Sequence, residues 1–525
     1  MDAVVVDDTA TFFAPVSSDL IDGLIGRYRQ ERLHIEEVSQ ILANPQYKGA
    51  VNYFLDGNGS KDGRHTHFNV ERLFESEGAI QSLNASYWNQ ALKLTDVLDC
   101  MPEVRRQEWY EQIREKKAPD FEEQTVRSTL MDLLSSRTKF FAERVDGIFR
   151  ALSREHVTNC PEGFGKRMIL YYVITSYGTS GHDRIGYIND LRAVIAKLMG
   201  RDEPKWNATH GLITALRRNT GQWFDVDGGA FRIRLYKKGT AHIEVHPDMA
   251  WRLNQILAYL YPLAIPSEFR SPPKRRTKTH KLMQRPLPFA VVGLIDDSRR
   301  SRTEQGFVYS LPLSSIHNQT AGALDEAGQV MQSIGGVRMG RSHDYVFDYL
   351  ADSVLEEIVI NGCIPDKKSH QFYPTPLKLA QLAVDKADIG PQHHCYEPSA
   401  GHGALADLMP KDRTTCIEIS LLHCEILKSK GYQTVQADFL TWAPGQPLAD
   451  RIVMNPPFSD GRWQEHVRTA SELVAPGGRL VAILPSGAKN KNLLESWNCT
   501  FSPIYDNEFS GASVSVVIMV ADRPA

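Results

Sequence analysis

The tetrapeptide Asn455-Pro456-Pro457-Phe458 contains the residue types best suited to chemistry in this chain. It follows a short apolar run, residues 452–454, that predicts a strand. The two prolines restrict the backbone, so the Asn455 side chain and the Pro456 carbonyl are expected to face the same way as paired hydrogen-bond acceptors. Two acceptors that hold the hydrogens of an exocyclic amino group make its nitrogen a better nucleophile, and Phe458 offers a ring on which a base can stack. An ordinary strand-to-loop turn is the structural alternative.

A glycine-containing turn upstream has the composition of a ligand-binding loop. Residues 395–397 predict a short strand, and Pro398-Ser399-Ala400-Gly401-His402-Gly403 follows it directly. Gly401 and Gly403 allow the backbone to come close to a ligand at a strand-to-helix turn.

Two acidic residues end the next two predicted strands. Glu418 follows residues 415–417, 21 positions after Glu397, where a carboxylate can hold the hydroxyls of a ribose. Asp438 follows residues 434–437 and can accept a hydrogen bond from an adenine amino group. Strands and helices alternate from His370 onward, which predicts a parallel α/β sheet. A helix is expected to start at Leu377, and a helix over 463–473, a strand over 479–484 and a final pair within 501–520 complete the sheet.

Taken in chain order, these segments resemble a known enzyme family. Glu397 to Leu405, Glu418, Asp438 and the tetrapeptide resemble motifs I to IV of class I S-adenosylmethionine-dependent methyltransferases. Phe372-Tyr373-Pro374-Thr375-Pro376 resembles motif X of the amino-methylating DNA methyltransferases, specifically the adenine N6 group. The likeness covers about residues 365–525 and implies a Rossmann-like, seven-stranded methyltransferase domain. Residues 1–365 resemble the uncharacterised amino-terminal region that is fused to such enzymes in phages and mobile elements.

The resemblance implies a role for each matching position. The glycine turn would border the methionine part of S-adenosylmethionine, and the motif X residues would close over its methionine end. Glu418 would hold the ribose and Asp438 the adenine, while the tetrapeptide would orient the target amino group and stack the flipped base. The implied catalytic residues are Asn455, Pro456, Pro457 and Phe458. The implied cofactor-binding residues are Phe372, Tyr373, Thr375, Glu397, Pro398, Ser399, Ala400, Gly401, Gly403, Glu418, Ile419, Asp438 and Phe439.

Residues 1–265 are expected to be mainly helical. Residues 131–153 have apolar side chains at helical spacing and predict a core-facing helix. Residues 231–246 alternate apolar and charged side chains around a Lys238-Gly239-Thr240 turn, which predicts a β-hairpin followed by an amphipathic helix over 249–260. This arrangement resembles a winged helix, and a solvated hairpin is the other interpretation.

Residues 266–365 are expected to connect the two halves. Ser271 to Lys281 contains five Lys or Arg residues and predicts a basic linker, either lying along a phosphate backbone or acting as a solvated tether. A buried strand is predicted over 289–295, a basic loop around Arg299, Arg300 and Arg302, and a helix over 346–360 that ends at Asn361-Gly362. The expected domains are therefore 1–265, 266–365 and 366–525.

The composition excludes several classes of protein. It is 42% apolar and 23% charged with a net charge of -3, so a nucleic-acid contact has to come from local patches. The seven cysteines show no Cys-x-x-Cys spacing, and His65 and His67 have no third ligand at a suitable distance, so no metal site is expected. Neither a signal peptide nor a membrane-length apolar run is present, which predicts a cytoplasmic protein with no membrane partner.

Three functions compete on this evidence. The leading one is N6 methylation of adenine in double-stranded DNA with the base flipped, in a setting such as restriction-modification. The second is amino-group methylation of RNA or of a protein glutamine, and the third is a nucleic-acid-binding protein with a vestigial methyltransferase fold. No Pro-Cys dipeptide occurs, which argues against cytosine C5 methylation. No residues remain for a carboxy-terminal recognition domain, so target reading is expected from the first 365 residues, a separate recognition subunit or a homodimer.

Overall fold

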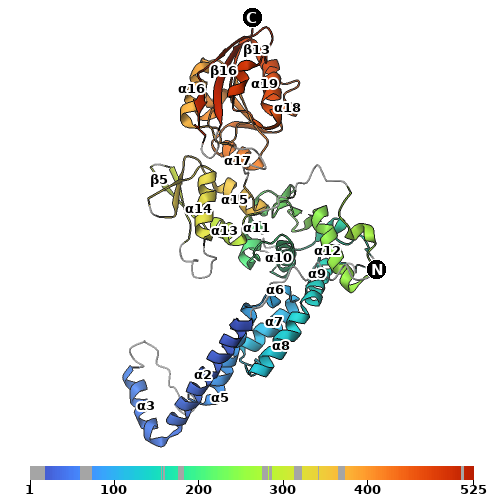
Figure 1. Ribbon diagram of the computed structural model, residues 1–525, viewed down its shortest axis with the longest axis vertical. Helices are drawn as coiled ribbons and strands as arrows, with labels where there is room; N and C mark the ends of the chain where they lie inside the picture. The colour runs from blue at the N-terminus through green and yellow to red at the C-terminus, as the bar shows by residue number, and fades with distance from the viewer. Residues whose placement is uncertain are drawn as a thin grey trace. The chain divides into compact units, whose positions relative to one another are not determined.

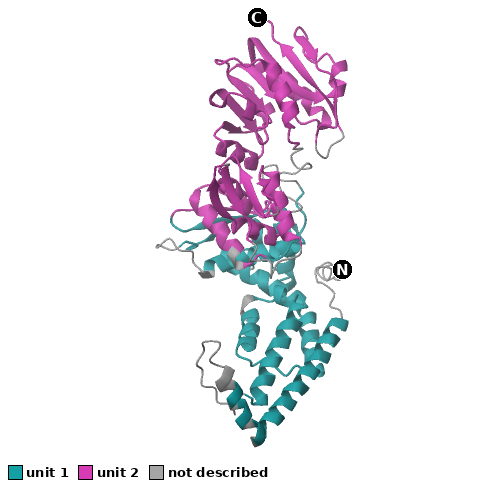
Figure 2. Ribbon diagram, turned by 90° about the vertical axis from the view of Figure 1, so that its left-hand side faces the viewer, with its two compact units in different colours: residues 1–203, 238–280 teal, residues 204–237, 281–525 magenta. Residues whose placement is uncertain are grey.

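The computed structural model describes residues 18–58, 74–154, 157, 160–174, 182–274, 282, 286–304, 306–312, 322–340, 342–364, 373–509 and 514–525 (Figure 1). The chain forms two compact units, residues 1–203 with 238–280 and residues 204–237 with 281–525 (Figure 2). The chain passes from the first unit to the second for the last time between residues 280 and 281, inside the predicted basic linker. The expected boundaries at 265 and 365 stay predictions. His65, His67 and residues 275–281 lie outside the described residues.

The first unit is mainly helical, as the apolar spacing predicts. The segment expected as one helix over 131–153 is two helices that meet at Ser136, and the second buries Phe141, Val145 and Ile148. Both strands of the predicted hairpin are present, β3 in the second unit and β4 here, and their side chains alternate between buried and half-buried. The winged-helix interpretation stays a prediction. The elements of this unit are α2 (Ser18–Ala43), α3 (Pro45–Asn58), α5 (Ser76–Lys93), α6 (Val97–Cys100), α7 (Glu103–Arg114), α8 (Glu123–Ser135), α9 (Arg137–Ser153), β1 (Met168–Leu170), α10 (His182–Leu198), β4 (Ala241–Val245) and α12 (Pro247–Leu260).

Two segments of the second unit differ from the predicted secondary structure. Residues 289–295 form a helix rather than a strand, since an apolar run of this length has no period that separates the two, and Pro288 precedes its first turn. The arginines expected in a loop form an exposed edge strand, whose backbone pairs with its neighbour without burying a side chain. The elements here are α11 (Trp206–Arg218), β2 (Trp223–Val226), β3 (Phe231–Leu235), α13 (Phe289–Asp296), β5 (Arg299–Thr303), β6 (Gly306–Ser310), α14 (Ala323–Ser333), β7 (Val337–Arg338), β8 (Asp344–Phe347) and α15 (Asp352–Asn361).

The helix expected over 346–360 is also only partly correct. Its first residues belong to β8, where Tyr345 and Phe347 alternate into the core, and the helix α15 begins at Asp352. Gly362 ends that helix with a φ of 69°, as the Asn361-Gly362 pair predicts. Strands β5, β6, β8 and β7 form an antiparallel sheet in that order.

The carboxy-terminal region is a Rossmann-like α/β domain. Its sheet has the order β11-β10-β9-β12-β13-β16-β14, in which the first five strands are parallel and β16 is antiparallel to both neighbours. This is the doubly wound order with one reversed strand inserted near its end. Helix α16 packs on one face, and α18 and α19 pack on the other (Figure 1). The elements are α16 (Leu377–Ala387), β9 (Cys395–Pro398), β10 (Thr414–Glu418), α17 (Leu421–Ser429), β11 (Gln433–Gln436), α18 (Phe439–Trp442), β12 (Ala449–Met454), α19 (Arg462–Leu473), β13 (Val474–Pro485), β14 (Asn498–Phe501), β15 (Tyr505–Asp506) and β16 (Ser515–Asp522).

The sheet contains eight strands where seven were expected. Strands β14 and β15 pair with successive parts of β16, so the last position of the sheet is divided in two. Pro503 lies between them and has no N–H to donate, which explains the interruption. Within the described part of the chain, no helix combines the length and apolar character needed to cross a bilayer. All seven cysteines are free thiols.

Candidate active site

A cavity of about 610 Å³ opens at the carboxyl edge of β9, β10 and β12. Ligands of doubly wound sheets bind at this edge, near the point where the strand order reverses. Fourteen of the seventeen predicted site residues line it: Tyr373, Thr375, Glu397, Ser399, Ala400, Gly401, Glu418, Ile419, Asp438, Phe439, Asn455, Pro456, Pro457 and Phe458. Pro398 and Gly403 are not among the lining residues, and Phe372 lies outside the described part of the chain.

The glycine turn holds its shape through three left-handed residues and one buried carboxyl. Ser399, Gly401 and Gly403 have φ angles of 61°, 55° and 83°. A Cβ on Gly403 would come within 2.9 Å of the Leu427 side chain on α17. Gly403 thus serves the conformation of the turn, and its place beside the cofactor stays a prediction.

Glu397 fixes the far end of the same turn. Its carboxyl is buried and accepts a hydrogen bond from the Ala406 amide at 2.8 Å. Burial raises the pKa of Glu397 well above its ordinary value. This side chain therefore stabilises the loop and favours a neutral carboxyl.

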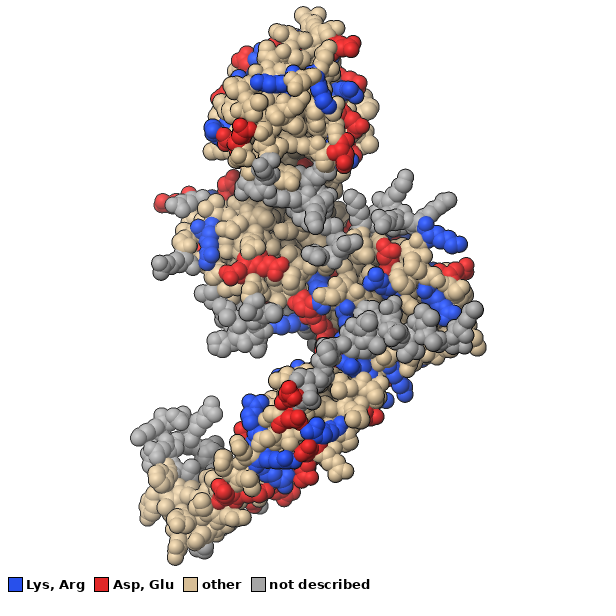
Figure 3. Space-filling view, in the orientation of Figure 1, with Lys and Arg blue, Asp and Glu red and all other residues tan. Residues whose placement is uncertain are grey.

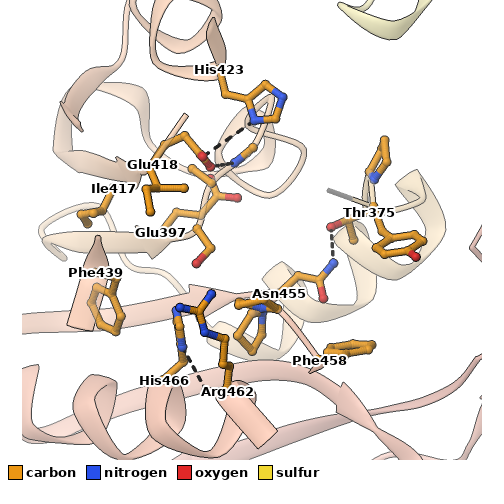
Figure 4. Close-up of a pocket in the computed structure, with 18 of the residues that line it drawn as sticks. Thr375, Glu397, Ile417, Glu418, His423, Phe439, Asn455, Phe458, Arg462 and His466 are labelled. Carbon is orange, nitrogen blue, oxygen red and sulfur yellow. Dashed lines mark hydrogen bonds and ion pairs between the residues drawn. The ribbon is translucent and has the colours of Figure 1, made fainter. Parts of the chain in front are cut away.

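Glu418, unlike Glu397, favours the ionised form of its carboxyl group. Its two carboxylate oxygens accept hydrogen bonds from the amides of Gly401 and Ser420, each at 2.8 Å. Burial alone would raise the pKa of Glu418, but hydrogen bonds from His423 and from these amides outweigh it and lower the pKa. Glu418 is thus a fixed anion at the end of β10, as a ribose-binding carboxylate has to be (Figure 4).

Asp438 and two apolar side chains form another part of the cavity. Asp438 precedes α18 and accepts a hydrogen bond from the Leu440 amide at 3.0 Å, the usual arrangement of a helix cap. Ile419, with 56% of its surface exposed, and the buried Phe439 both line the cavity. An apolar surface beside a carboxylate suits a purine ring that carries an amino group.

The tetrapeptide follows β12 directly, as the sequence predicts. The side-chain amide nitrogen of Asn455 donates a hydrogen bond to the Thr375 hydroxyl at 3.0 Å (Figure 4). Asn455 is half-buried and Pro456 is buried. Phe458 packs partly against the cores on both faces of the sheet while its ring lines the cavity.

Among the cavity residues that were not predicted from the sequence are three histidines and an arginine: His402, His423, Arg462 and His466. The rings of His402 and His423 contact edge to face at 4.7 Å beside Glu418, and burial lowers the pKa of His402. His402 lies inside the glycine turn, so its place in the motif was the available signal.

Arg462 and His466 lie one turn apart at the start of α19. Nδ1 of His466 is 3.0 Å from the Arg462 carbonyl oxygen, a contact that requires a proton on Nδ1 and leaves Nε2 as an acceptor in the neutral ring. Burial lowers the pKa of His466 and favours that neutral form. Arg462 and His466 are four positions apart in the sequence and follow the tetrapeptide closely, and this spacing could have indicated that they share one face of a helix.

The described residues contain no group of three or more His, Cys, Asp or Glu side chains arranged to hold a metal.

Comparisons with known proteins add the following. A family model for a domain of unknown function, DUF4942, matches residues 80–263. No curated protein matches the chain. Solved structures similar to part of the chain include TrmN and two proteins that are methyltransferases by name.

TrmN from Thermus thermophilus is 22% identical with a TM-score of 0.24, and the match covers 28% of this chain and 48% of TrmN. The chain therefore spans about half the length of TrmN. The 23S rRNA methyltransferase ErmE is 20% identical with a TM-score of 0.25, and the match covers 29% of this chain and 70% of ErmE. Coclaurine N-methyltransferase, bound to N-methylheliamine and SAH, is 18% identical with a TM-score of 0.19. The match covers 21% of this chain and 35% of the coclaurine enzyme.

Proposed function

We propose that the chain transfers a methyl group from S-adenosylmethionine to an exocyclic amino nitrogen, and that the substrate is N6 of adenine in DNA. The observation that carries this proposal is the presence of Asn455, Glu418 and Asp438 in one cavity at the carboxyl edge of the sheet. S-adenosylmethionine supplies an electrophilic methyl group when bound. Its adenosine part fits the fixed anion of Glu418, the cap carboxylate of Asp438 and the apolar side chains of Ile419 and Phe439.

The chain's own residues then align the acceptor. The Asn455 side-chain oxygen and the Pro456 carbonyl accept the two hydrogens of the target amino group, which directs its nitrogen lone pair away from the ring. The ring of Phe458 stacks on the flipped base. Alignment of the two reacting groups accounts for the rate enhancement, and no covalent intermediate with the protein is needed.

Arg462 supports a nucleic acid as the substrate. It is the one Arg or Lys among the described residues that line the cavity, and it forms no ion pair with a described carboxylate. Figure 4 shows its side chain directed into the cavity near Asn455. A guanidinium at this place suits the phosphate of a flipped nucleotide better than a neutral glutamine side chain. The choice of DNA over RNA rests on the motif X resemblance, and target reading is proposed for the amino-terminal half or a second subunit.

Methylation assays on the purified full-length chain test the proposal. Labelled S-adenosylmethionine is offered with DNA, RNA and glutamine peptides, and the products are identified by mass spectrometry. We expect N6-methyladenine in DNA, together with a modified motif in the genome of cells that express the protein. Methyl transfer only to RNA or to peptide would reassign the substrate, and no transfer at all would favour a binding protein.

Asn455→Ala is the matched control for this assay. It removes one acceptor but leaves Glu418 and Asp438 untouched, so cofactor affinity measured by calorimetry should hardly change. Turnover should fall about 10²- to 10³-fold, the usual cost of losing one hydrogen bond that strengthens in the transition state. Asn455→Asp keeps an acceptor and should retain partial activity. A wild-type rate for Asn455→Ala would show that the tetrapeptide is a structural turn.

A further inference from the structure

The hydrogen bond between Asn455 and Thr375 joins two segments that are 80 residues apart. Thr375 lies between Pro374 and Pro376, so the backbone that carries its hydroxyl has little freedom. Helix α16 begins two residues later and packs its buried residues Leu379 and Ala380 in one core with Val453 of β12. Val453 in turn precedes Asn455 by two residues. The two hydrogen-bonding side chains are therefore each anchored close to a shared, fully buried contact.

An asparagine amide has one donor end and one acceptor end of nearly the same shape. If its NH₂ group faced the target amino group, two donors would oppose each other and no hydrogen bond would form. If its oxygen faces the target, it accepts an amino hydrogen as the proposed reaction requires. The rate thus depends on which end of the Asn455 amide points at the substrate.

We propose that Thr375 is the positioning residue that selects this orientation. Its hydroxyl oxygen accepts from the Asn455 Nδ2 at 3.0 Å and so leaves Oδ1 for the target amino group. This inference rests on the proposed methyl transfer and adds a role to Thr375 that is separate from closing over the cofactor.

Steady-state kinetics of Thr375→Val test the inference in two backgrounds, with S-adenosylmethionine and DNA each varied up to saturation. Valine keeps the shape of threonine but has no hydroxyl, and Thr375→Ser restores the hydroxyl. With Asn455 present, kcat should fall about tenfold for valine, the effect of one lost hydrogen bond, and recover for serine. In the Asn455→Asp background the fall should be below about twofold, since a carboxylate has no donor end to misplace.

Three results would overturn the inference. An equal loss of kcat in both backgrounds would mean that Thr375 acts through the fold or through Pro456. A change confined to the KM for S-adenosylmethionine would mean that it acts only on the cofactor. A valine variant faster than wild type would mean that the hydroxyl binds the amide oxygen and withholds it. A wild-type chain that methylates nothing would instead overturn the proposed function, and this role with it.

Discussion

Arg462 brings the only lysine- or arginine-type charge among the described cavity residues, from the first position of α19. If it binds the phosphate of the target nucleotide, Arg462→Ala should raise the Kd for DNA about 10- to 100-fold, since hydrogen bonds to charged groups contribute about 1.5–3 kcal/mol. The salt dependence of DNA binding should become shallower by about one unit of log–log slope. Binding by fluorescence anisotropy across a salt series measures both effects.

The cofactor's carboxylate is the competing anion for Arg462. Calorimetry with S-adenosylmethionine and with methylthioadenosine, which lacks the carboxylate, distinguishes the two. Equal affinities of wild type and Arg462→Ala for both compounds agree with a phosphate contact. Weaker binding of S-adenosylmethionine alone would assign the guanidinium to the cofactor. Arg462→Lys serves as the control because it keeps the charge but loses the bidentate geometry.

Sequence reasoning located the cavity residues through ordered motifs, and it failed where a role depends on packing. Glu418 ends β10, Asp438 and Asn455 follow the ends of β11 and β12, and parallel strands bring their carboxyl ends to one edge. The edge-to-face contact of His402 with His423 joins a loop to a helix and leaves no trace in local spacing. The motif predicts a glycine at position 403, but the contact of that position with the Leu427 side chain on α17 is visible only in the folded chain.

At the scale of elements, the glycine turn depends on the buried carboxyl of Glu397. The folded-state pKa of this group lies above its unfolded value, so the folded chain binds the proton more tightly. Its contribution to the free energy of unfolding is greatest at low pH and decreases as the pH rises above the unfolded value of about 4.3. Glutamine has the same shape as the protonated acid, accepts from the Ala406 amide equally well and cannot ionise. Thermal melts of Glu397→Gln should therefore show a Tm advantage over wild type that grows with pH. A difference in Tm that is constant from pH 5 to pH 9 would contradict this account.

The elements predicted wrongly share a physical cause. Residues 289–295 are apolar without a period, and packing against α14 and α15 decides in favour of helix α13. Strand β5 has no apolar residue at all, so only its backbone pairing with β6 could identify it. Helix α12 was predicted to within two residues, and α16 begins at the predicted Leu377, because each has one apolar stripe and a proline at its start.

At the scale of the whole chain, the connecting segment shares a hydrophobic core with part of the α/β domain. Leu422 and Ile426 of α17 belong to the same core as α13, α14 and α15. Ser353 and Ser429 form a hydrogen bond at 3.0 Å between α15 and α17. Because residues 204–237 also belong to this unit, no single cut separates the two units. Substitutions in the full-length chain are therefore better tests of DNA binding than truncations.

The distribution of charge indicates where such substitutions belong. On the face shown in Figure 3, Lys and Arg alternate with Asp and Glu over the helices of the first unit. Ion pairs occur among these helices, as between Arg29 and Glu123 at 2.6 Å. Two runs of basic residues differ from this pattern in the sequence, the linker from Lys274 to Lys281 and the exposed strand β5.

We expect the linker to make the phosphate contacts. Replacing Lys274, Arg275 and Arg276 by serine should weaken binding of double-stranded DNA and lower the log–log salt slope by up to about 2.7, at about 0.9 per lost phosphate contact. The matched control replaces Arg299 and Arg302 on β5 and leaves Arg300, which pairs with Asp352 at 2.7 Å. This control should change the slope little. If instead the salt slope of DNA binding falls in the β5 variant and is unchanged in the linker variant, the DNA lies along β5 and the linker is a solvated tether.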